Sequence, residues 1–125
     1  NYNRIAAYIS ALPVIDSKIN INTAPALILA SLDKSLDVNT VQQMLKAKQA
    51  KFEHFSTLAG LLDQDLFSRL SPESKTLAND VFDVKSAFFK AQIEVVFGER
   101  KRQMSSYLMR KNQQVFVYSR SLVPF

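Results

Sequence analysis

The spacing of apolar residues changes near residue 80, and this change constrains the fold more than any other feature of the sequence. Before it, apolar residues recur at intervals of three and four, as in 38–45, and so lie on one side of a helix. From 82 to 97 apolar and polar residues alternate, which is typical of a strand with one buried face. The sequence therefore predicts an α+β fold, with a helical module over 1–80 and an antiparallel sheet over 81–125.

The helical module is predicted to consist of short helices separated by caps and prolines. A first helix should end before Pro13, and a second should carry Pro25 in its first turn after a cap at Asn22 or Thr23. The predicted starts of later helices are Asp37 or Asn39, Ser56, and Ser71 followed by Pro72. The helices that flank residues 31–37 are expected to pair as an antiparallel hairpin.

The sheet is predicted to be a β-meander of three sequential strands. A long strand ends at Phe97, and residues 98–100 turn it back into 103–110. Residues 112–114 then turn the chain into a last strand over 115–119. The side chains expected on the buried face of the first strand are Ala87, Phe89, Ala91, Ile93, Val95 and Phe97.

Composition excludes several classes of chemistry. The chain is 47% hydrophobic, as a globular chain should be, and it contains no cysteine for disulfides or thiolate metal sites. The two glycines, Gly60 and Gly98, rule out a glycine-rich phosphate loop. His54 is the single histidine, and its position between aromatic residues indicates a packed or surface side chain rather than a catalytic base. We therefore expect a protein that is not an enzyme.

Two pairs of carboxylates are candidate ligands for a hard cation such as calcium. Asp63 lies close to Asp65 in sequence, and Asp80 lies close to Asp83. Neither pair has the spacing of an EF-hand loop. Because Asp is favoured at helix caps and turns, we interpret both pairs as caps or solvated turns.

The charge distribution leaves two interpretations open. The net charge is +5, and basic residues cluster at 100–102 and 110–111, so nucleic acid or anionic lipid are possible partners without being required. A charged hairpin tip is more often a solvated turn that prevents strand aggregation. The aromatic residues of the predicted strands could either stack against nucleic-acid bases or pack in a hydrophobic core, and core packing is the favoured interpretation. These aromatics are Phe88, Phe89, Phe97, Tyr107, Phe116 and Tyr118.

Residues 19–29 carry a motif with a resemblance to known families. The motif is an extended apolar-Asn-apolar-Asn-Thr-Ala phrase that includes Asn20, Asn22, Thr23 and Ala24 and leads into a helix. It resembles the opening of helix-hairpin-helix modules. Two families share it: the DNA-binding domain of DNA-uptake proteins, and the K-type minor pseudopilin of type II secretion systems, which carries a helical insert similar to a sterile-alpha-motif domain.

The connector that follows the motif separates these two families. A DNA-binding hairpin presents backbone N–H groups to a phosphate and needs residues that adopt left-handed conformations without strain. Residues 31–37 contain no glycine and hold Asp33 and Asp37, whose charges repel a phosphate. A DNA-binding helix-hairpin-helix protein is therefore the alternative hypothesis, and no nucleic-acid partner is expected.

The rest of the chain resembles the pseudopilin. Ser86-Ala87-Phe88-Phe89 matches a family phrase of the form Ser-x-Phe-Phe that precedes an alternating strand. A further strand ends in Arg110, as in the family, and a short last strand follows over 115–118. The resemblance covers residues 10–120 and does not include the family's hydrophobic N-terminal helix or the upstream half of its helical insert.

The resemblance implies a function as well as a fold. It implies a component of the general secretion pathway that is anchored in the inner membrane by the N-terminal helix, faces the periplasm, and assembles with I-type and J-type minor pseudopilins at the pseudopilus tip. Filament initiation and capping during protein export are the implied roles. Calcium is a cofactor that the family resemblance alone suggests. Partner contacts are expected around Phe88, Tyr107 and Tyr118, because aromatic residues often anchor interfaces.

Overall fold

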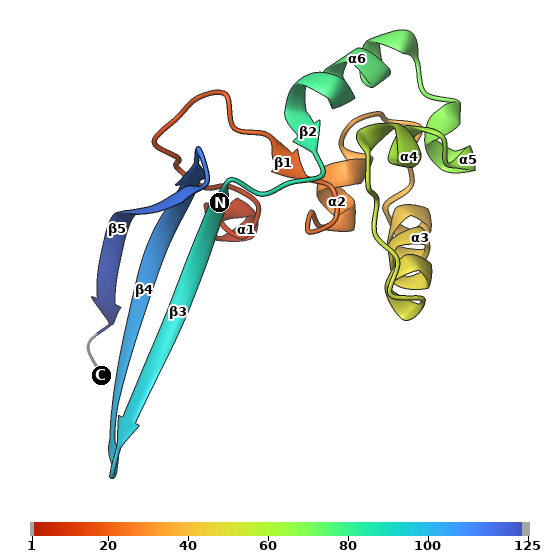
Figure 1. Cartoon of the computed structure of the whole chain (residues 1–125). Helices are drawn as coiled ribbons and strands as arrows, with labels where there is room; N and C mark the ends of the chain where they lie inside the picture. The colour runs from red at the N-terminus through yellow and green to blue at the C-terminus, as the bar shows by residue number, and fades with distance from the viewer. Residues whose placement is uncertain (1, 124–125) are drawn as a thin grey trace. The chain divides into compact units, whose positions relative to one another are not determined.

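The chain divides into two compact units, Asn1–Lys85 and Ser86–Phe125. A computed structural model describes residues 2–123 (Figure 1). Residues 81–85 belong with the first unit, because β2 (Phe82–Asp83) pairs in parallel with β1 (Ile19–Asn20). This short parallel pair replaces the beginning of the long strand that the alternating pattern predicts from residue 82. Even so, the predicted α+β class is confirmed, with helices in the first unit and an antiparallel sheet in the second.

The first unit contains six short helices among its described residues. They are α1 (Tyr2–Ile5), α2 (Ala26–Ala30), α3 (Val38–Ala50), α4 (Leu58–Leu62), α5 (Asp65–Ser68) and α6 (Pro72–Val81). Two predicted caps are confirmed. The Asp37 carboxylate accepts a hydrogen bond from the backbone N–H of Thr40 at 2.8 Å, and the Ser71 hydroxyl accepts one from the N–H of Ser74 at 3.1 Å. Each cap satisfies a donor that a helix start leaves without an intrahelical partner.

Other predicted helix boundaries are wrong. Pro25 occupies the N-cap of α2 and gives no side-chain hydrogen bond, so neither Asn22 nor Thr23 is the cap. Thr57 rather than Ser56 caps α4, because the Thr57 hydroxyl accepts from the N–H of Gly60. Capping depends on the backbone conformation of one position, and a run of neighbouring polar residues does not reveal which one adopts it.

The first predicted helix is also shorter than its apolar spacing suggests. Helix α1 ends at Ile5, and the side chains of Ile9 and Leu12 are exposed. Without a buried stripe, helical spacing gives a short segment little stabilisation, since most helix stability in proteins comes from packing. The helix therefore stops well before Pro13.

The end of α3 holds a residue in an unusual conformation. Phe52 has φ 56° and its side chain is 96% exposed. Its N–H donates to the carbonyl of Gln49, and the N–H of Glu53 donates to the carbonyl of Lys48, which is the pattern of a Schellman cap. Glycine is usual at this left-handed position, so phenylalanine is held there at a conformational cost.

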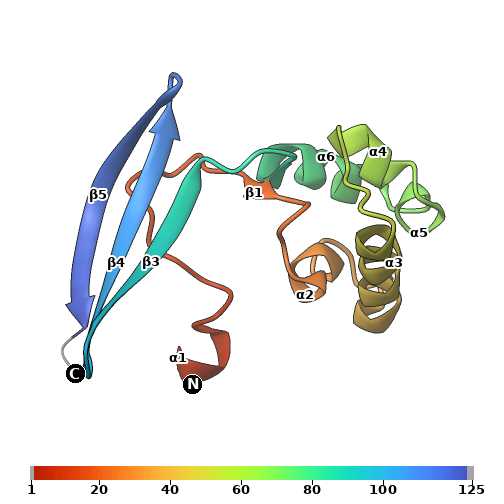
Figure 2. The same ribbon diagram turned by 60° about the horizontal axis from the view of Figure 1, so that its bottom comes forward.

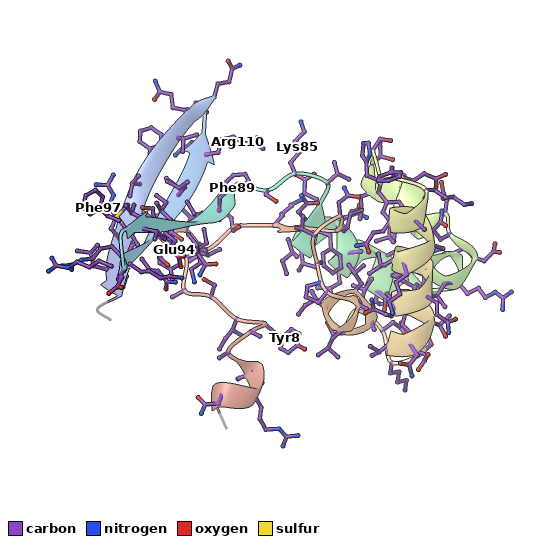
Figure 3. All side chains as sticks on the ribbon, turned by 90° about the horizontal axis from the view of Figure 1, so that it is seen from below. Tyr8, Lys85, Phe89, Glu94, Phe97 and Arg110 are labelled. Carbon is purple, nitrogen blue, oxygen red and sulfur yellow. The ribbon has the colours of Figure 1, made fainter. Side chains whose placement is uncertain are left out.

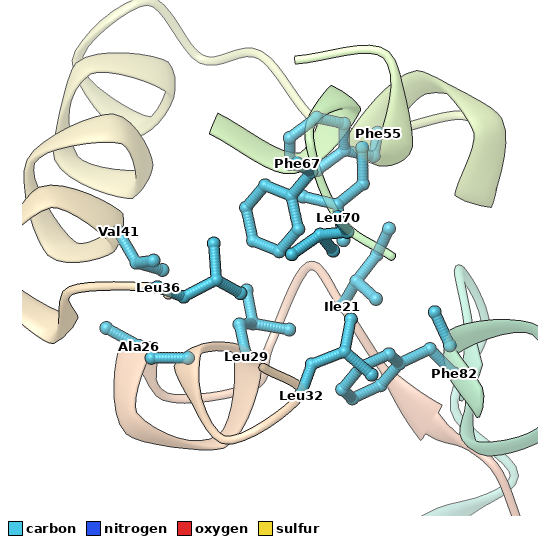
Figure 4. Close-up of a cluster of buried hydrophobic side chains, with 13 residues drawn as sticks. Ile21, Ala26, Leu29, Leu32, Leu36, Val41, Phe55, Phe67, Leu70 and Phe82 are labelled. Atoms are coloured by element: carbon cyan, nitrogen blue, oxygen red, sulfur yellow. The ribbon is translucent and has the colours of Figure 1, made fainter. Parts of the chain in front are cut away.

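The hydrophobic core of the first unit joins Ile21, which directly follows β1, with Phe82 of β2 and residues in and around the helices (Figure 4). Its largest fully buried side chains are Phe67, Ile21, Leu29, Leu61 and Val41. Within the predicted stripe of α3, Val41 is fully buried and Met44 and Leu45 pack against the core, whereas Val38 is exposed. This core gives the unit its own hydrophobic interior.

The second unit is an antiparallel meander in the order β3-β4-β5 (Figure 2). Its strands are β3 (Phe88–Phe97), β4 (Arg100–Lys111) and β5 (Gln114–Val123). The predicted meander is confirmed, although the last two strands are longer than predicted. Both turns use left-handed residues: Gly98 has φ 60° in the first, and Asn112 and Gln113 have φ 51° and 63° in the second. Two-residue hairpin turns need such angles to match the twist of the strands.

The predicted burial of the sheet is wrong. Strand register places one set of apolar side chains on a common side, here called the apolar face. These residues are Phe89, Ala91, Ile93, Val95 and Phe97 of β3, Met104 and Leu108 of β4, and Val115, Val117 and Leu122 of β5. The exposed fraction reaches 85% for Phe97 and 74% for Leu122. A three-stranded sheet is a single layer, so no second layer among the described residues of this unit covers the face.

None of the helices in the stretch 2–123 has the length and the apolar character needed to cross a lipid bilayer.

Candidate interaction surfaces

Three aromatic side chains meet on the side of the sheet opposite the apolar face. The rings of Phe88 and Tyr118 lie 6.0 Å apart at 82°, an edge-to-face arrangement, and those of Tyr107 and Tyr118 lie 6.2 Å apart. The ammonium group of Lys90 lies 5.6 Å from the centre of the Tyr107 ring. Such contacts stabilise aromatic groups beyond the area they bury. The structure thus brings together all three residues for which partner contacts are predicted.

A β-bulge places Tyr118 in this aromatic cluster of Phe88, Tyr107 and Tyr118. Tyr107 pairs with Ser119 and Leu108 pairs with Val117, so Tyr118 is the extra residue of β5. A bulge changes the direction of a side chain and bends the strand. All three aromatic residues are half-buried, so each keeps part of its surface accessible.

The family-motif residues of the second unit lie together at the beginning of β3. The Arg110 guanidinium donates to the carbonyl of Ser86 at 2.9 Å and lies 5.7 Å from the centre of the Phe89 ring (Figure 3). The backbone N–H of Arg110 donates to the carbonyl of Ala87 at 2.7 Å. Arg110 therefore fixes the segment that leads into the sheet, which is a structural role.

The family-motif residues of the first unit also have structural roles. The backbone carbonyl of Asn20 accepts hydrogen bonds from the N–H groups of Thr23 and Ala24, and its side-chain oxygen accepts from the N–H of Asn22. The Asn22 amide in turn bonds both backbone groups of Phe55: its nitrogen donates to the carbonyl at 3.0 Å, and its oxygen accepts from the N–H at 2.7 Å. The motif thus forms a tight turn and ties it to a distant part of the unit.

The connector between α2 and α3 is organised by a carboxylate. Asp33 accepts hydrogen bonds from the Ser74 hydroxyl at 2.7 Å, the Ser35 N–H at 2.9 Å and the Ser35 hydroxyl at 2.7 Å. These bonds, that of Ser74 first, lower the pKa of Asp33 to about 2. No residue of 31–37 has a positive φ, so the connector lacks the left-handed backbone of an anion-binding nest. Its geometry and its charge both oppose phosphate binding.

Two of the remaining candidate ligands lie at helix ends. Asp63 lies at the C-cap of α4 and Asp65 begins α5, as the interpretation of helix ends predicts. Within residues 2–123, no group of three or more His, Cys, Asp and Glu side chains is arranged to hold a metal ion. His54 is exposed, which agrees with its interpretation as a surface residue.

Sequence reasoning missed the apolar face as an accessible surface. Alternation identifies which side chains share a face but not whether another layer covers them. The alternating pattern therefore carries no signal that distinguishes a covered face from an accessible one.

Comparison with known proteins places the chain in a family. The model of the family "Type II secretion system (T2SS), protein K" matches residues 19–85. A chain in the crystal structure of the GspK-GspI-GspJ complex from the enterotoxigenic Escherichia coli type 2 secretion system has a similar fold, with a TM-score of 0.77 and 22% sequence identity. The match covers 99% of the present chain and 43% of the solved one, so the present chain spans less than half of that protein. No curated protein sequence matches. Because the family model matches more than half of the residues, the chain belongs to the protein K family of type II secretion systems.

Proposed function

We propose that the chain is part of a minor pseudopilin that acts at the tip of a type II secretion pseudopilus. It would help to initiate and cap the filament through contacts with I-type and J-type minor pseudopilins. Support comes from the family match over residues 19–85 and from the solved complex, which is named for GspI and GspJ beside GspK. The role is assembly through surfaces, with no reaction centre.

The observation that carries this proposal is the exposure of both faces of the sheet. Among the described residues of the second unit, the buried side chains are the small serines Ser105 and Ser106. Phe97 and Leu122 of the apolar face are exposed, and so are Val96 and Phe116 of the opposite face. Soluble monomers rarely expose large contiguous apolar patches, and such patches mark sites of association. A sheet that exposes its apolar side chains in this way is suited to binding other subunits.

The helical unit supplies a physical reason for capping. Heterologous contacts extend a filament as long as each subunit offers the next a free surface. The helical unit has its own core, and the strands of the sheet pair with one another without it. The helical unit is therefore additional volume on the subunit. Bulk at the growing end would prevent addition of another subunit and so define the start of the filament.

The location follows from the same proposal. Family members are expected to be anchored in the inner membrane by an N-terminal helix and to face the periplasm. A subunit held there meets other pseudopilins before the filament grows. A periplasmic position also agrees with a role in protein export that uses contacts alone.

Affinity for the other minor pseudopilins tests the proposal. Purified I-type and J-type subunits should bind the chain, and Tyr107→Ala and Tyr118→Ala should each weaken binding by roughly tenfold, because aromatic residues dominate interface energies. Tyr8→Ala is the matched control, since Tyr8 lies in the first unit and is 43% exposed. Unchanged affinity in both sheet variants would remove the aromatic cluster from the interface, and failure of the unsubstituted chain to bind would reject the proposed function.

A further inference from the structure

The end of the β3–β4 hairpin combines exposed apolar side chains with clustered cations. Phe97 stands at this end (Figure 3) and is 85% exposed, and the neighbouring Val95 and Val96 are 58% and 56% exposed. Arg100, Lys101 and Arg102 follow directly after the turn, and all three are exposed. We name residues 95–102 the hairpin tip.

Strand register distributes both kinds of side chain over the two sides of the hairpin tip. Val95 pairs with Arg102 and Phe97 pairs with Arg100 on the apolar face, while Val96 pairs with Lys101 on the opposite face. Directly paired residues of an antiparallel ladder project on the same side. Each side of the hairpin tip therefore presents apolar surface next to a cation.

The net positive charge of the chain lies in the second unit. The segment 86–125 holds seven Lys and Arg against two Asp and Glu, whereas 1–85 holds nine of each. Lys101 forms an ion pair with Glu94 at 3.3 Å. Within the described part of the chain, Arg100 and Arg102 form no ion pair, and Glu99 in the turn is the one acid of the hairpin tip. The net charge of +5 thus lies entirely in the sheet unit.

We infer that the hairpin tip, through Phe97 and the two valines with Arg100 and Arg102, binds the surface of an anionic lipid bilayer. A bilayer interface surrounds an inserted element, so the apolar side chains on both sides leave water together. The cations then meet lipid phosphates, whose potential attracts basic residues close to the membrane. This binding differs from the proposed subunit contacts in its partner, although Val95 and Phe97 also belong to the apolar face.

The exposure of apolar side chains on both sides of the hairpin tip favours a bilayer over a protein or a nucleic acid, the other partners that a basic segment could bind. A protein docked on the apolar face buries Val95 and Phe97 but leaves Val96 exposed on the opposite side. A nucleic acid offers phosphates but no apolar layer for Phe97. A bilayer provides anionic groups and an apolar layer to both sides of the hairpin tip at once, whereas protein subunits would need two separate contacts, one on each face.

Vesicle co-sedimentation of the purified 125-residue chain tests this inference. The chain should bind vesicles made of equal parts phosphatidylcholine and phosphatidylglycerol. It should bind pure phosphatidylcholine vesicles far more weakly, and raised salt should reduce binding to the mixed vesicles, since exposed charges are screened. Equal binding to both kinds of vesicle, or binding to neither, overturns the inference.

Variants identify the residues responsible. Replacing both arginines by glutamine, R100Q with R102Q, should weaken binding to the mixed vesicles by about 30-fold, because each cation near an anionic membrane contributes roughly fivefold. The R100K and R102K pair should stay close to the unsubstituted chain, since lipid phosphates respond to charge, whereas bidentate recognition of a protein carboxylate requires arginine. A loss of binding in the lysine pair contradicts lipid recognition.

The apolar contribution has its own matched control. Phe97→Ser should weaken vesicle binding by roughly tenfold. Phe52→Ser removes another highly exposed phenylalanine, from the first unit, and should leave vesicle binding unchanged. Equal effects of the two substitutions overturn the assignment to the hairpin tip. If Phe97→Ser instead weakens binding to the I-type and J-type subunits or to duplex DNA and has no effect on vesicles, the hairpin tip is a protein or nucleic-acid surface and the inference fails.

Discussion

The side-chain amide of Asn22 pairs with both backbone groups of Phe55, across 33 residues of sequence. The pairing imitates the exchange of two hydrogen bonds between neighbouring strands, with a side chain in place of one backbone. Phe55 is buried, so its backbone groups need partners inside the protein. Asn22 supplies them and thereby joins the turn before α2 to the segment that follows α3.

Removing the Asn22 amide should destabilise the helical unit. Asn22→Ala leaves the N–H and the carbonyl of Phe55 without these partners and should lower the free energy of unfolding by about 2 kcal/mol. Asn22→Asp keeps the acceptor but loses the donor, so a smaller loss of about 1 kcal/mol is expected. Urea denaturation followed by helical circular dichroism measures both. Equal stability of the alanine variant and the unsubstituted chain would show that the pairing contributes nothing.

The Asp33 carboxylate should make the helical unit sensitive to acid. Its pKa falls from 3.8 to about 2 in the folded state, so folding favours the ionised form. The stability it contributes is present above pH 3.8 and is lost as the pH falls towards 2. Urea midpoints measured from pH 5 to pH 2, in steps of about half a pH unit, follow this loss.

Two substitutions isolate the part of this acid sensitivity that comes from Asp33. Asp33→Asn should flatten the pH profile between 3.8 and about 2. Ser74→Ala removes the hydrogen bond that lowers the pKa most and should shrink the same part of the profile. Profiles that stay parallel to that of the unsubstituted chain would contradict the role of Asp33.

Two phenylalanines, one buried and one exposed, test where the core lies. Phe67 is fully buried and Phe52 is 96% exposed. Phe67→Ala should cost about 3 to 5 kcal/mol, because it removes a large side chain from the core and leaves a cavity. Phe52→Ala should have little effect on the free energy of unfolding. Similar losses in the two variants would mean that the core assignment is wrong.

The turn between β4 and β5 offers a stabilising substitution. Gln113 has φ 63°, a conformation that favours glycine. Gln113→Gly should raise the free energy of unfolding by roughly 0.5 to 1 kcal/mol. The substitution relieves backbone strain in the folded state, and this gain exceeds the loss that comes from a more flexible unfolded chain. Gly98→Ala is the opposite control: Gly98 has φ 60° and an added Cβ atom would meet open space, so only conformational strain should lower stability. Thermal unfolding, followed by the circular dichroism signal of the strands, measures the stability of both variants. A Gln113→Gly variant that is less stable than the unsubstituted chain would contradict this explanation of the turn.

Much of the fold follows from local patterns in the sequence. The alternation in β3 and the turns at Gly98 and Asn112 predict the meander because neighbouring strands pair through short loops. The caps Asp37 and Ser71 are predictable because each combines a suitable side chain with a following helical stretch.

The features that sequence reasoning missed depend on distant partners. The parallel pair of Ile19–Asn20 with Phe82–Asp83 joins segments that are far apart in the sequence. The local pattern indicates that residues 19–22 are extended but does not identify the partner strand. Asn22 serves as a polar cap in the local pattern but bonds Phe55 in the folded protein. The exposure of Phe97 could not be predicted either, because alternation identifies a face without showing what covers it.

Hydrogen–deuterium exchange of the chain, alone and mixed with purified I-type and J-type minor pseudopilins, tests the central claim most directly. Backbone amides of β3, β4 and β5 should become protected in the mixture, while those of α3 should keep their exchange rates. No change in protection anywhere, or protection confined to the helical unit, would contradict the proposal that the sheet joins this subunit to its partners.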